Sequence, residues 1–171
     1  VARGSPLVTT SYVSAAMGEW DEPARAAGVL LLNEVGLDPG IDHMTAMRIV
    51  HGVRRGGGRV LAFRSYCGGV PAPEDNNNPW GYKFSWSPRG VVLATRNAAR
   101  YLQDGREVNV APADLFADVR VVDVPGAGTF ECYPNRDSLP YAGYYNLPDA
   151  AVMFRGTLRY PGWCRTWLAL A

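Results

Sequence analysis

The sequence predicts an α+β fold with a mixed, largely antiparallel sheet. Two apolar, β-rich runs near the start, residues 7–13 and 29–32, flank a helical stretch in strand–helix–strand order. From Arg106 onward, strand patterns follow one another without intervening helices, which favours antiparallel pairing. The 171 residues fit one domain that can bury about 70% of the surface of its extended form, so folding requires neither a metal nor a disulfide.

The first helix is expected to begin near Asp21, because Pro23 is tolerated only in a first turn, although Ser14 could begin helical turns earlier. Gly28 is the expected C-cap of this helix. The short apolar run 29–32, bounded by glycine and polar residues, is interpreted as a buried strand.

The stretch 33–43, NEVGLDPGIDH, joins this strand to an amphipathic helix. Pro39-Gly40 forces a turn, after which Asp42 is expected to cap the helix through the Met44 and Thr45 amides. A strand that ends in acids and backbone donors at a helix N-terminus is a common ligand site in α/β proteins. This stretch is therefore the first candidate for chemistry.

The amphipathic helix is expected over 41–54 and ends at the glycines of 56–58. Its core-facing side chains recur at helical spacing and are Met44, Met47 and Val50. A strand is expected from 60–63 onward, ending in Ser65-Tyr66-Cys67-Gly68-Gly69. The two glycines permit close approach of a ligand or of backbone.

Residues 70–86 form a long segment rich in proline, asparagine and aromatic residues. Loops of this length inside a domain are usually lids or binding loops, and the regular aromatic spacing argues against disorder. The aromatic side chains could cover a pocket or a dimer partner. Ser87-Pro88 is a strong helix start, and an apolar face follows it, so a helix is expected as far as Gly105.

The remaining elements are expected to be strands separated by proline-containing turns. The strands cover 107–110, 119–124, 129–132 and 151–160, and the turns fall at Pro125-Gly126, Pro134-Asn135 and Pro148-Asp149. The last residues, 163–171, are interpreted as the beginning of an apolar helix. Because an exposed apolar end is unfavourable, the chain is expected to be a piece of a larger enzyme.

Charge and cysteine content exclude several classes of function. The net charge of +1 and the pI near 7.9 come without a basic or acidic block, so nucleic acid and membrane surfaces are poor partners. Three widely spaced cysteines without a CxxC argue against a zinc site and a secreted disulfide framework. No apolar run approaches the roughly 20 residues of a membrane span. We therefore expect a cytoplasmic protein that binds a small molecule or another protein.

Two residues could carry chemistry. The sequence has no GxGxxG, P-loop, HExxH or GxSxG motif, and His43 and His51 lie too far apart along a helix to share a metal. Cys67 at a strand end could be a reactive thiol, although a buried hydrophobic role is commoner. Asp38 could be a general base, an acceptor for an ammonium group, or only the first residue of a turn.

Arg136, Arg155 and Arg159 lie in the predicted antiparallel part of the chain. Arg155 and Arg159 lie an even number of residues apart, so they share a face of the last strand with Thr157. Two guanidinium forks beside a hydroxyl suit a carboxylate ligand. Salt bridges to acids on neighbouring strands, such as Asp137 or Asp123, explain the arginines equally well.

Six motifs, spread over nearly the whole chain, together resemble the glutamate-forming saccharopine dehydrogenase family. They are 8–14 (VTTSYVS), 33–43 (NEVGLDPGIDH), 65–69 (SYCGG) with 71–75 (PAPED), 81–87 (GYKFSWS), 133–138 (YPNRDS) and 155–160 (RGTLRY).

The resemblance implies a three-part enzyme with a Rossmann cofactor domain, a central substrate-binding and dimerisation domain, and a returning C-terminal segment. Residues 1–35 would be the end of the Rossmann domain, and 36–171 most of the substrate-binding domain. The implied fold of this second domain has helices on one face of the sheet, similar to the C-terminal α/β domain of glyceraldehyde-3-phosphate dehydrogenase-like oxidoreductases. A homodimer is implied, and the chain alone is expected to be inactive.

The family reaction interconverts saccharopine with glutamate and 2-aminoadipate 6-semialdehyde in lysine metabolism, and hydride passes between substrate and NADP or NAD. By resemblance, the catalytic residues are Tyr12, Asp38 and Cys67, with the proton-transfer role left open among them. The implied substrate contacts are Ser11, Tyr12, Arg136, Thr157, Leu158 and Arg159. The implied cofactor contacts are Ser11, Tyr12, Leu37, Asp38 and Ser87, and no metal is implied.

Two other interpretations stay open. A carboxynorspermidine-type or homospermidine-type oxidoreductase shares this layout but handles polyamines, whereas the arginine-rich last strand favours a polyanionic substrate. A non-catalytic binding or dimerisation module would keep the fold and use 80–86 as a partner surface. NAD against NADP, the direction of the reaction and fusion to a lysine-ketoglutarate reductase are left open by the sequence.

Overall fold

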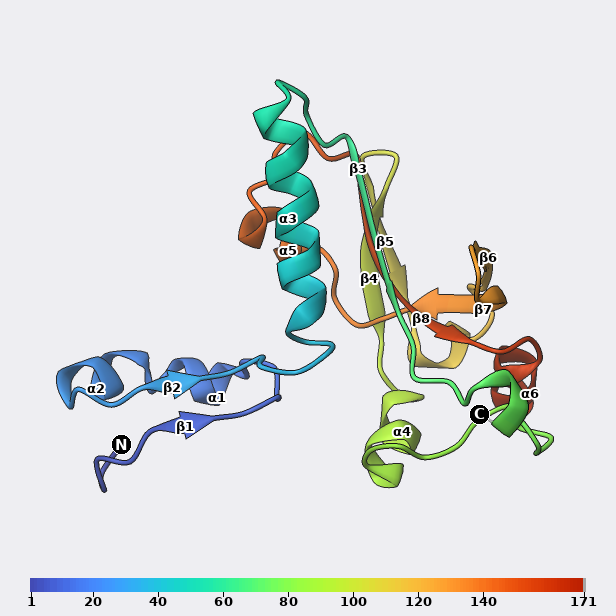
Figure 1. Ribbon diagram of the computed structural model, residues 1–171, viewed down its shortest axis with the longest axis horizontal. Helices are drawn as coiled ribbons and strands as arrows, with labels where there is room; N and C mark the ends of the chain where they lie inside the picture. Colours follow the sequence, from blue (N-terminus) through green and yellow to red (C-terminus); the bar gives the residue numbers. More distant parts are fainter. Residues whose placement is uncertain (171) are drawn as a thin grey trace. The chain divides into compact units, whose positions relative to one another are not determined.

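A computed structural model describes residues 1–170, and the chain forms two compact units, Val1–Gly56 and Gly57–Ala171 (Figure 1). Within the first unit, β1 (Leu7–Val8) pairs in parallel with β2 (Leu31–Leu32). The connection between them carries α1 (Ala15–Gly18) and α2 (Asp21–Ala26). The predicted strand–helix–strand order is confirmed.

Both helix starts considered from the sequence are used. The Ser14 Oγ accepts a hydrogen bond from the Met17 N–H at 3.1 Å and caps α1, while α2 begins at Asp21. Gly28 ends α2 with a φ of +63°, a conformation that glycine adopts without strain.

The prediction that 29–32 is a buried strand is wrong for this chain. Leu30 and Leu32 are 55% and 43% exposed. The reason is that β2 pairs only with β1 among the described residues, so this two-stranded sheet leaves much of its apolar surface uncovered.

The long helix of the first unit is confirmed as α3 (Ile41–Arg55), but two of its details differ from expectation. Because α3 begins at Ile41, Asp42 lies inside the first turn, and its Oδ1 accepts from the Gly40 N–H at 2.7 Å instead of capping Met44 and Thr45. The buried stripe of α3 runs through Ala46 and Val50, four residues apart, which leaves Met44 outside it at 68% exposed.

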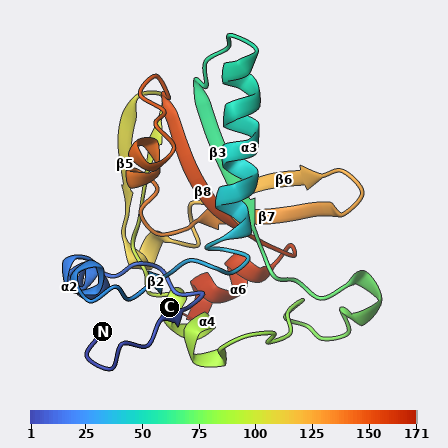
Figure 2. The same cartoon turned by 60° about the vertical axis from the view of Figure 1, so that its left-hand side comes forward.

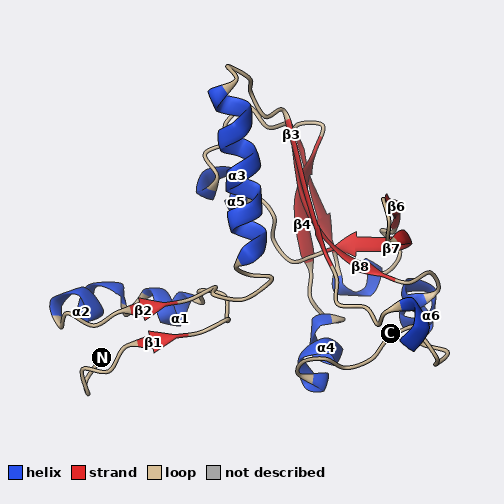
Figure 3. Ribbon diagram, viewed as in Figure 1, coloured by secondary structure: helices blue, strands red, loops and turns tan. Residues whose placement is uncertain are grey.

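The second unit contains a six-stranded sheet organised around its longest strand, β8 (Val152–Arg159; Figure 3). The strand order is β5-β4-β8-β7-β6, and β3 adds to β8 in parallel while all other pairs are antiparallel. The predicted mixed, largely antiparallel sheet is confirmed. The other strands are β3 (Ala62–Cys67), β4 (Ala99–Gln103), β5 (Arg106–Val110), β6 (Arg120–Val124) and β7 (Gly128–Pro134).

The predicted helix from Ser87 to Gly105 is only half right. The Ser87 Oγ accepts from the Gly90 N–H at 3.0 Å and begins α4 (Pro88–Ala94), as expected. Residues 99–103 instead form β4, which makes a hairpin with β5. Asp104 and Gly105 form its turn with φ values of 52° and 74°, and Asp-Gly is a strong signal for a hairpin turn with two positive φ angles.

Further short helices complete the second unit. They are η1 (Pro73–Asp75), η2 (Pro112–Asp114), α5 (Pro140–Tyr144), which the sequence pattern did not predict, and α6 (Trp163–Leu170), which it did. The β6–β7 hairpin extends away from the part of the sheet formed by β3, β8 and β5 (Figure 2). In the described part of the chain, no helix has the length and apolar character that crossing a membrane requires.

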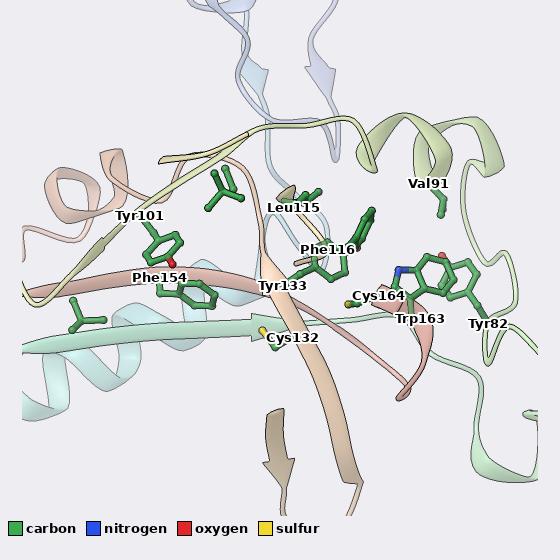
Figure 4. Close-up of a cluster of buried hydrophobic side chains, with 13 residues drawn as sticks. Tyr82, Val91, Tyr101, Leu115, Phe116, Cys132, Tyr133, Phe154, Trp163 and Cys164 are labelled. Atoms are coloured by element: carbon green, nitrogen blue, oxygen red, sulfur yellow. The ribbon is translucent and has the colours of Figure 1, made fainter. Parts of the chain in front are cut away.

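Aromatic side chains dominate the core of the second unit (Figure 4). Phe154 of β8 lies 5.1 Å from the Tyr101 ring, and the Arg120 guanidinium covers its face at 3.9 Å. The 70–86 loop is ordered over this core: Tyr82 is buried against Trp163, and the Tyr160 hydroxyl donates to the Pro71 carbonyl at 2.9 Å. The loop therefore uses its aromatic residues partly to close the core.

Candidate functional site

Several predicted site residues of the first unit follow the carboxyl ends of its parallel strands. Ser11 and Tyr12 come after β1, and Leu37 and Asp38 come after β2. The Tyr12 hydroxyl donates a hydrogen bond to Asp38 Oδ1 at 2.6 Å, a short distance typical of a charge-assisted bond. Ser11 lies alongside, because its carbonyl accepts from the Glu34 N–H at 3.1 Å. Leu37 is exposed.

The turn that carries Asp38 is held by its own backbone and by Glu34. Gly36 donates to the Pro39 carbonyl at 2.9 Å, and a side chain at Gly40 would overlap the Gly36 backbone, so glycine is required there. One Glu34 oxygen accepts from the Val13 N–H at 3.1 Å, and the other lies 2.9 Å from His43 Nε2. His43 is thus a structural partner of this turn.

In the second unit, Cys67 and Thr157 lie opposite each other in the parallel β3–β8 register. Gly68, next along the chain, packs against the Leu158 backbone so closely that any side chain would collide with it. Cys67, Thr157 and Leu158 are therefore brought together at the end of β3.

Arg159 is a buried cation, only 6% exposed. Its guanidinium carbon lies 4.9 Å from the centre of the Tyr82 ring and 5.2 Å from that of Trp163. Nη1 donates to the Leu158 carbonyl at 2.8 Å, but the buried Nε has no hydrogen-bond partner. No carboxylate within residues 1–170 forms a salt bridge with Arg159. A buried guanidinium without an acidic partner carries a desolvation cost that its contacts in this unit offset only in part.

The two acids considered as salt-bridge partners of the arginines of β8 contact other residues. Asp137 forms a salt bridge with Arg100 at 2.6 Å, and Asp123 accepts from the Thr129 hydroxyl. Asp137 and Asp123 are therefore not the salt-bridge partners of Arg159. Arg155 is also buried, and its Nη1 donates to the Tyr141 hydroxyl at 2.8 Å.

Arg136 and Ser87 occupy two further positions of the second unit. Arg136 is an exposed residue in the loop between β7 and α5, with a φ of 54°. Ser87 is exposed and caps α4. Sequence reasoning missed Tyr82 and Trp163 as partners of Arg159. Tyr82 lies in the 81–87 motif, but the alternation of aromatic residues there does not show which of the rings is buried.

No disulfide joins the three cysteines, which lie in different surroundings. Cys132 and Cys164 are buried; burial raises the pKa of Cys132 to about 12 and also raises the pKa of Cys164, where Glu131 adds to the effect. Cys67 is only half-buried. Among residues 1–170, no group of three or more histidine, cysteine or acidic residues is arranged to hold a metal.

This difference predicts selective alkylation. At pH 7–9 the raised pKa keeps Cys132 neutral, and Cys164 likewise, so neither supplies the reactive thiolate. Iodoacetamide should modify Cys67 well before the other two, as measured by mass spectrometry of peptides from the native protein. In denaturant all three should react at similar rates. Native labelling of Cys132 ahead of Cys67 would contradict the burial described above.

Comparison with known proteins identifies the family. A family model described as the saccharopine dehydrogenase C-terminal domain matches residues 36–171. The chain is 53% identical over 156 residues to the saccharopine dehydrogenase (NADP(+), L-glutamate-forming) of Pyricularia oryzae and 49% identical over 156 residues to that of Saccharomyces cerevisiae. Each alignment covers 91% of this chain and 35% of the relative.

A solved structure agrees with these sequence matches. The apo, histidine-tagged saccharopine dehydrogenase (L-Glu forming) from S. cerevisiae superposes with a TM-score of 0.86 at 48% identity, covering 96% of this chain and 37% of that one. The chain thus spans about a third of the length of these fungal relatives. On the family match and these identities, the chain belongs to the saccharopine dehydrogenase family.

Proposed function

We propose that this chain supplies the substrate-binding part of an NADP- or NAD-dependent saccharopine dehydrogenase that forms L-glutamate. Arg159 is the observation that carries the proposal. Removing a cation from water is unfavourable unless an opposite charge compensates it, and the Tyr82 and Trp163 rings compensate it only in part. A substrate carboxylate paired with the guanidinium would complete the compensation.

The shape and charge of saccharopine suit these residues. It carries three carboxylates, a primary ammonium and a secondary ammonium, so several arginines and at least one acid suit it. Arg159 and Arg136 would bind carboxylates, with Thr157 and the Leu158 backbone beside them. Asp38 would stabilise positive charge on the substrate nitrogen, and the Tyr12 hydroxyl would orient Asp38 through their 2.6 Å hydrogen bond. Cys67 is the catalytic residue that we propose for the second unit.

The first unit has residues in positions where α/β proteins bind a nicotinamide dinucleotide. Ligands of open α/β sheets bind at the carboxyl ends of parallel strands, which is where Ser11, Tyr12, Leu37 and Asp38 follow β1 and β2. These residues, with Ser87 of the second unit, would contact the cofactor. When bound, the nicotinamide gives or accepts the hydride. We accordingly assign residues 1–35 to the end of a Rossmann domain and 36–171 to the substrate-binding domain.

Assembly, location and wider fold relationship are further parts of the proposal. The parent protein would be cytoplasmic, for which the cysteines without disulfides are the support, and would lack nucleic-acid and membrane partners, for which the balanced charge is the support. The proposed homodimer rests on the family resemblance alone. The mixed sheet with its helices is compatible with a relationship to the C-terminal domain of glyceraldehyde-3-phosphate dehydrogenase-like oxidoreductases.

The decisive test is hydride transfer by the full-length parent protein. Saccharopine and carboxynorspermidine would be offered in separate assays with NADP and with NAD, and formation of the reduced nicotinamide would be followed by absorbance. We expect turnover of saccharopine only, because two arginines, Arg136 and Arg159, suit a substrate with several carboxylates, and carboxynorspermidine has one carboxylate on a polycationic chain. Turnover of the polyamine alone would support the related polyamine oxidoreductase, and absence of hydride transfer with both would support a non-catalytic module.

A further inference from the structure

The loop that carries Arg136, residues 135–138, is held between two strands. On one side, Arg100 of β4 donates its N–H to the Arg136 carbonyl at 2.9 Å, and its own carbonyl accepts from the Ser138 N–H at 2.7 Å. These bonds form a parallel bridge between Arg100 and Asp137. The two backbone bonds to Arg100 thus flank Asp137, and one of them is made by the Arg136 carbonyl itself.

The Arg100 side chain makes a second connection to the same loop. Its Nη2 and Nε donate to Asp137 Oδ2 at 2.6 and 3.2 Å. The other carboxylate oxygen of Asp137 accepts from the Leu139 N–H at 3.0 Å, which fixes the residues after Arg136. Glu107 of β5 accepts from Arg100 Nη1 at 3.4 Å. The Arg100 side chain is therefore bound by two acids of the protein, and the shorter of these contacts holds the loop through Asp137.

The opposite side of the loop is attached to β8. The Asn135 N–H donates to the Arg155 carbonyl at 2.8 Å, and the buried Ser138 Oγ accepts from the Arg155 N–H at 2.9 Å. Between these attachments, Arg136 takes a φ of 54°, a left-handed conformation that residues with a side chain adopt only when their surroundings hold them there. The contacts of Arg100 supply part of that constraint.

We propose that Arg100, through its ion pair with Asp137, is a positioning residue that fixes the direction in which Arg136 meets a substrate carboxylate. The inference rests on the proposed function, because it assumes that Arg136 binds the substrate. The backbone bonds of Arg100 would form with any residue at that position, so the effect of its side chain is separable. Displacement of a binding group by about 1 Å can cost up to 100-fold in rate.

A double-mutant cycle in the full-length enzyme tests this role. Arg100→Ala should raise the KM for saccharopine about tenfold and leave the KM for the nicotinamide nucleotide unchanged, as expected for loss of a residue that orients a ligand-binding group. In an Arg136→Ala background, Arg100→Ala should have no further effect on the saccharopine KM. Arg100→Lys, which keeps the charge but loses the two-nitrogen contact, should recover only part of the loss. Arg106→Ala, at an exposed arginine of the same hairpin, is the control.

The readout separates positioning from folding and from failure of the proposed function. A smaller folded fraction lowers the apparent kcat and leaves KM unchanged, so a pure kcat loss in Arg100→Ala would overturn the inference. Additive effects of Arg100→Ala and Arg136→Ala would also overturn it, because the two residues would then act independently. If Arg136→Ala alone leaves the saccharopine KM unchanged, the carboxylate role of Arg136 fails and the inference fails with it. If only Arg136→Ala has an effect, the proposed function stands and the positioning role is rejected.

Discussion

Replacing Arg159 by methionine should lower kcat/KM for saccharopine about 30- to 5,000-fold, because truncating one partner of a buried charge pair costs roughly 2–5 kcal/mol. Methionine keeps an unbranched side chain of similar reach and removes the guanidinium that lies over the Tyr82 and Trp163 rings. The loss should lie mainly in the KM for saccharopine, with the KM for the nicotinamide nucleotide little changed.

The same substitution should leave Tm unchanged or raise it. Arg159 is buried without an acidic partner among residues 1–170, and its Nε lacks a hydrogen bond, so an apolar side chain of similar length relieves a desolvation penalty. Arg120→Met is the matched control, since Arg120 also stacks on aromatic rings, those of Tyr101 and Phe154. A fall in Tm, or equal changes of both KM values, would count against a carboxylate-binding role for Arg159.

Gly68→Ala should damage stability and activity together. An added Cβ would lie 2.8 Å from the Leu158 Cβ and 3.0 Å from its carbonyl carbon, closer than real contacts allow. The end of β3 would have to move away from Leu158 of β8. The Leu158 carbonyl accepts a hydrogen bond from Arg159 Nη1, so this movement would disturb Arg159 as well. We expect a loss of about 1–3 kcal/mol in the free energy of unfolding, typical of overpacking, and a rise in the saccharopine KM.

Thermal melting and steady-state kinetics of the full-length protein check this prediction. Gly143→Ala is the control, because Gly143 lies in α5 with open space where its Cβ would be, and alanine favours a helix. It should be neutral or slightly stabilising. A Gly68→Ala protein with native Tm and native KM would show that β3 and β8 tolerate more separation than their contact suggests.

Local signals predicted the elements whose residues all pointed the same way. The 41–54 helix had a turn before it, an amphipathic pattern within it and glycines after it, and the structure has it at Ile41–Arg55. The helix predicted after Ser87 was too long because the apolar spacing was followed past the residue at which α4 ends, Ala94. Ala98, Ala99 and Leu102 suit helical spacing, but Asp104-Gly105 favours a hairpin, and pairing with β5 and β8 decided the outcome.

The candidate site was less predictable because it depends on contacts between distant segments. That Arg155, Thr157 and Arg159 recur at every second residue of one strand could be derived from the period of two. The rings that cover Arg159 could not be derived in this way, because Tyr82 comes from a loop and Trp163 from the last helix described. Likewise, nothing local to Arg136 indicates that Arg100 of β4 contacts its loop. Periodicity orders side chains along one element, and tertiary packing selects their partners.

The parallel pairing of β3 with β8 has a consequence for synthesis on the ribosome. Ala62 lies opposite Val152 and Cys67 opposite Thr157, so β3 emerges from the ribosome long before its partner strand has been translated. The central sheet cannot be completed until nearly all of the second unit exists. Pairing across such a sequence separation is slow and leaves an unpaired strand edge open to wrong contacts in the meantime. Until β8 has left the ribosome, the edge of β3 that will pair with it stays open.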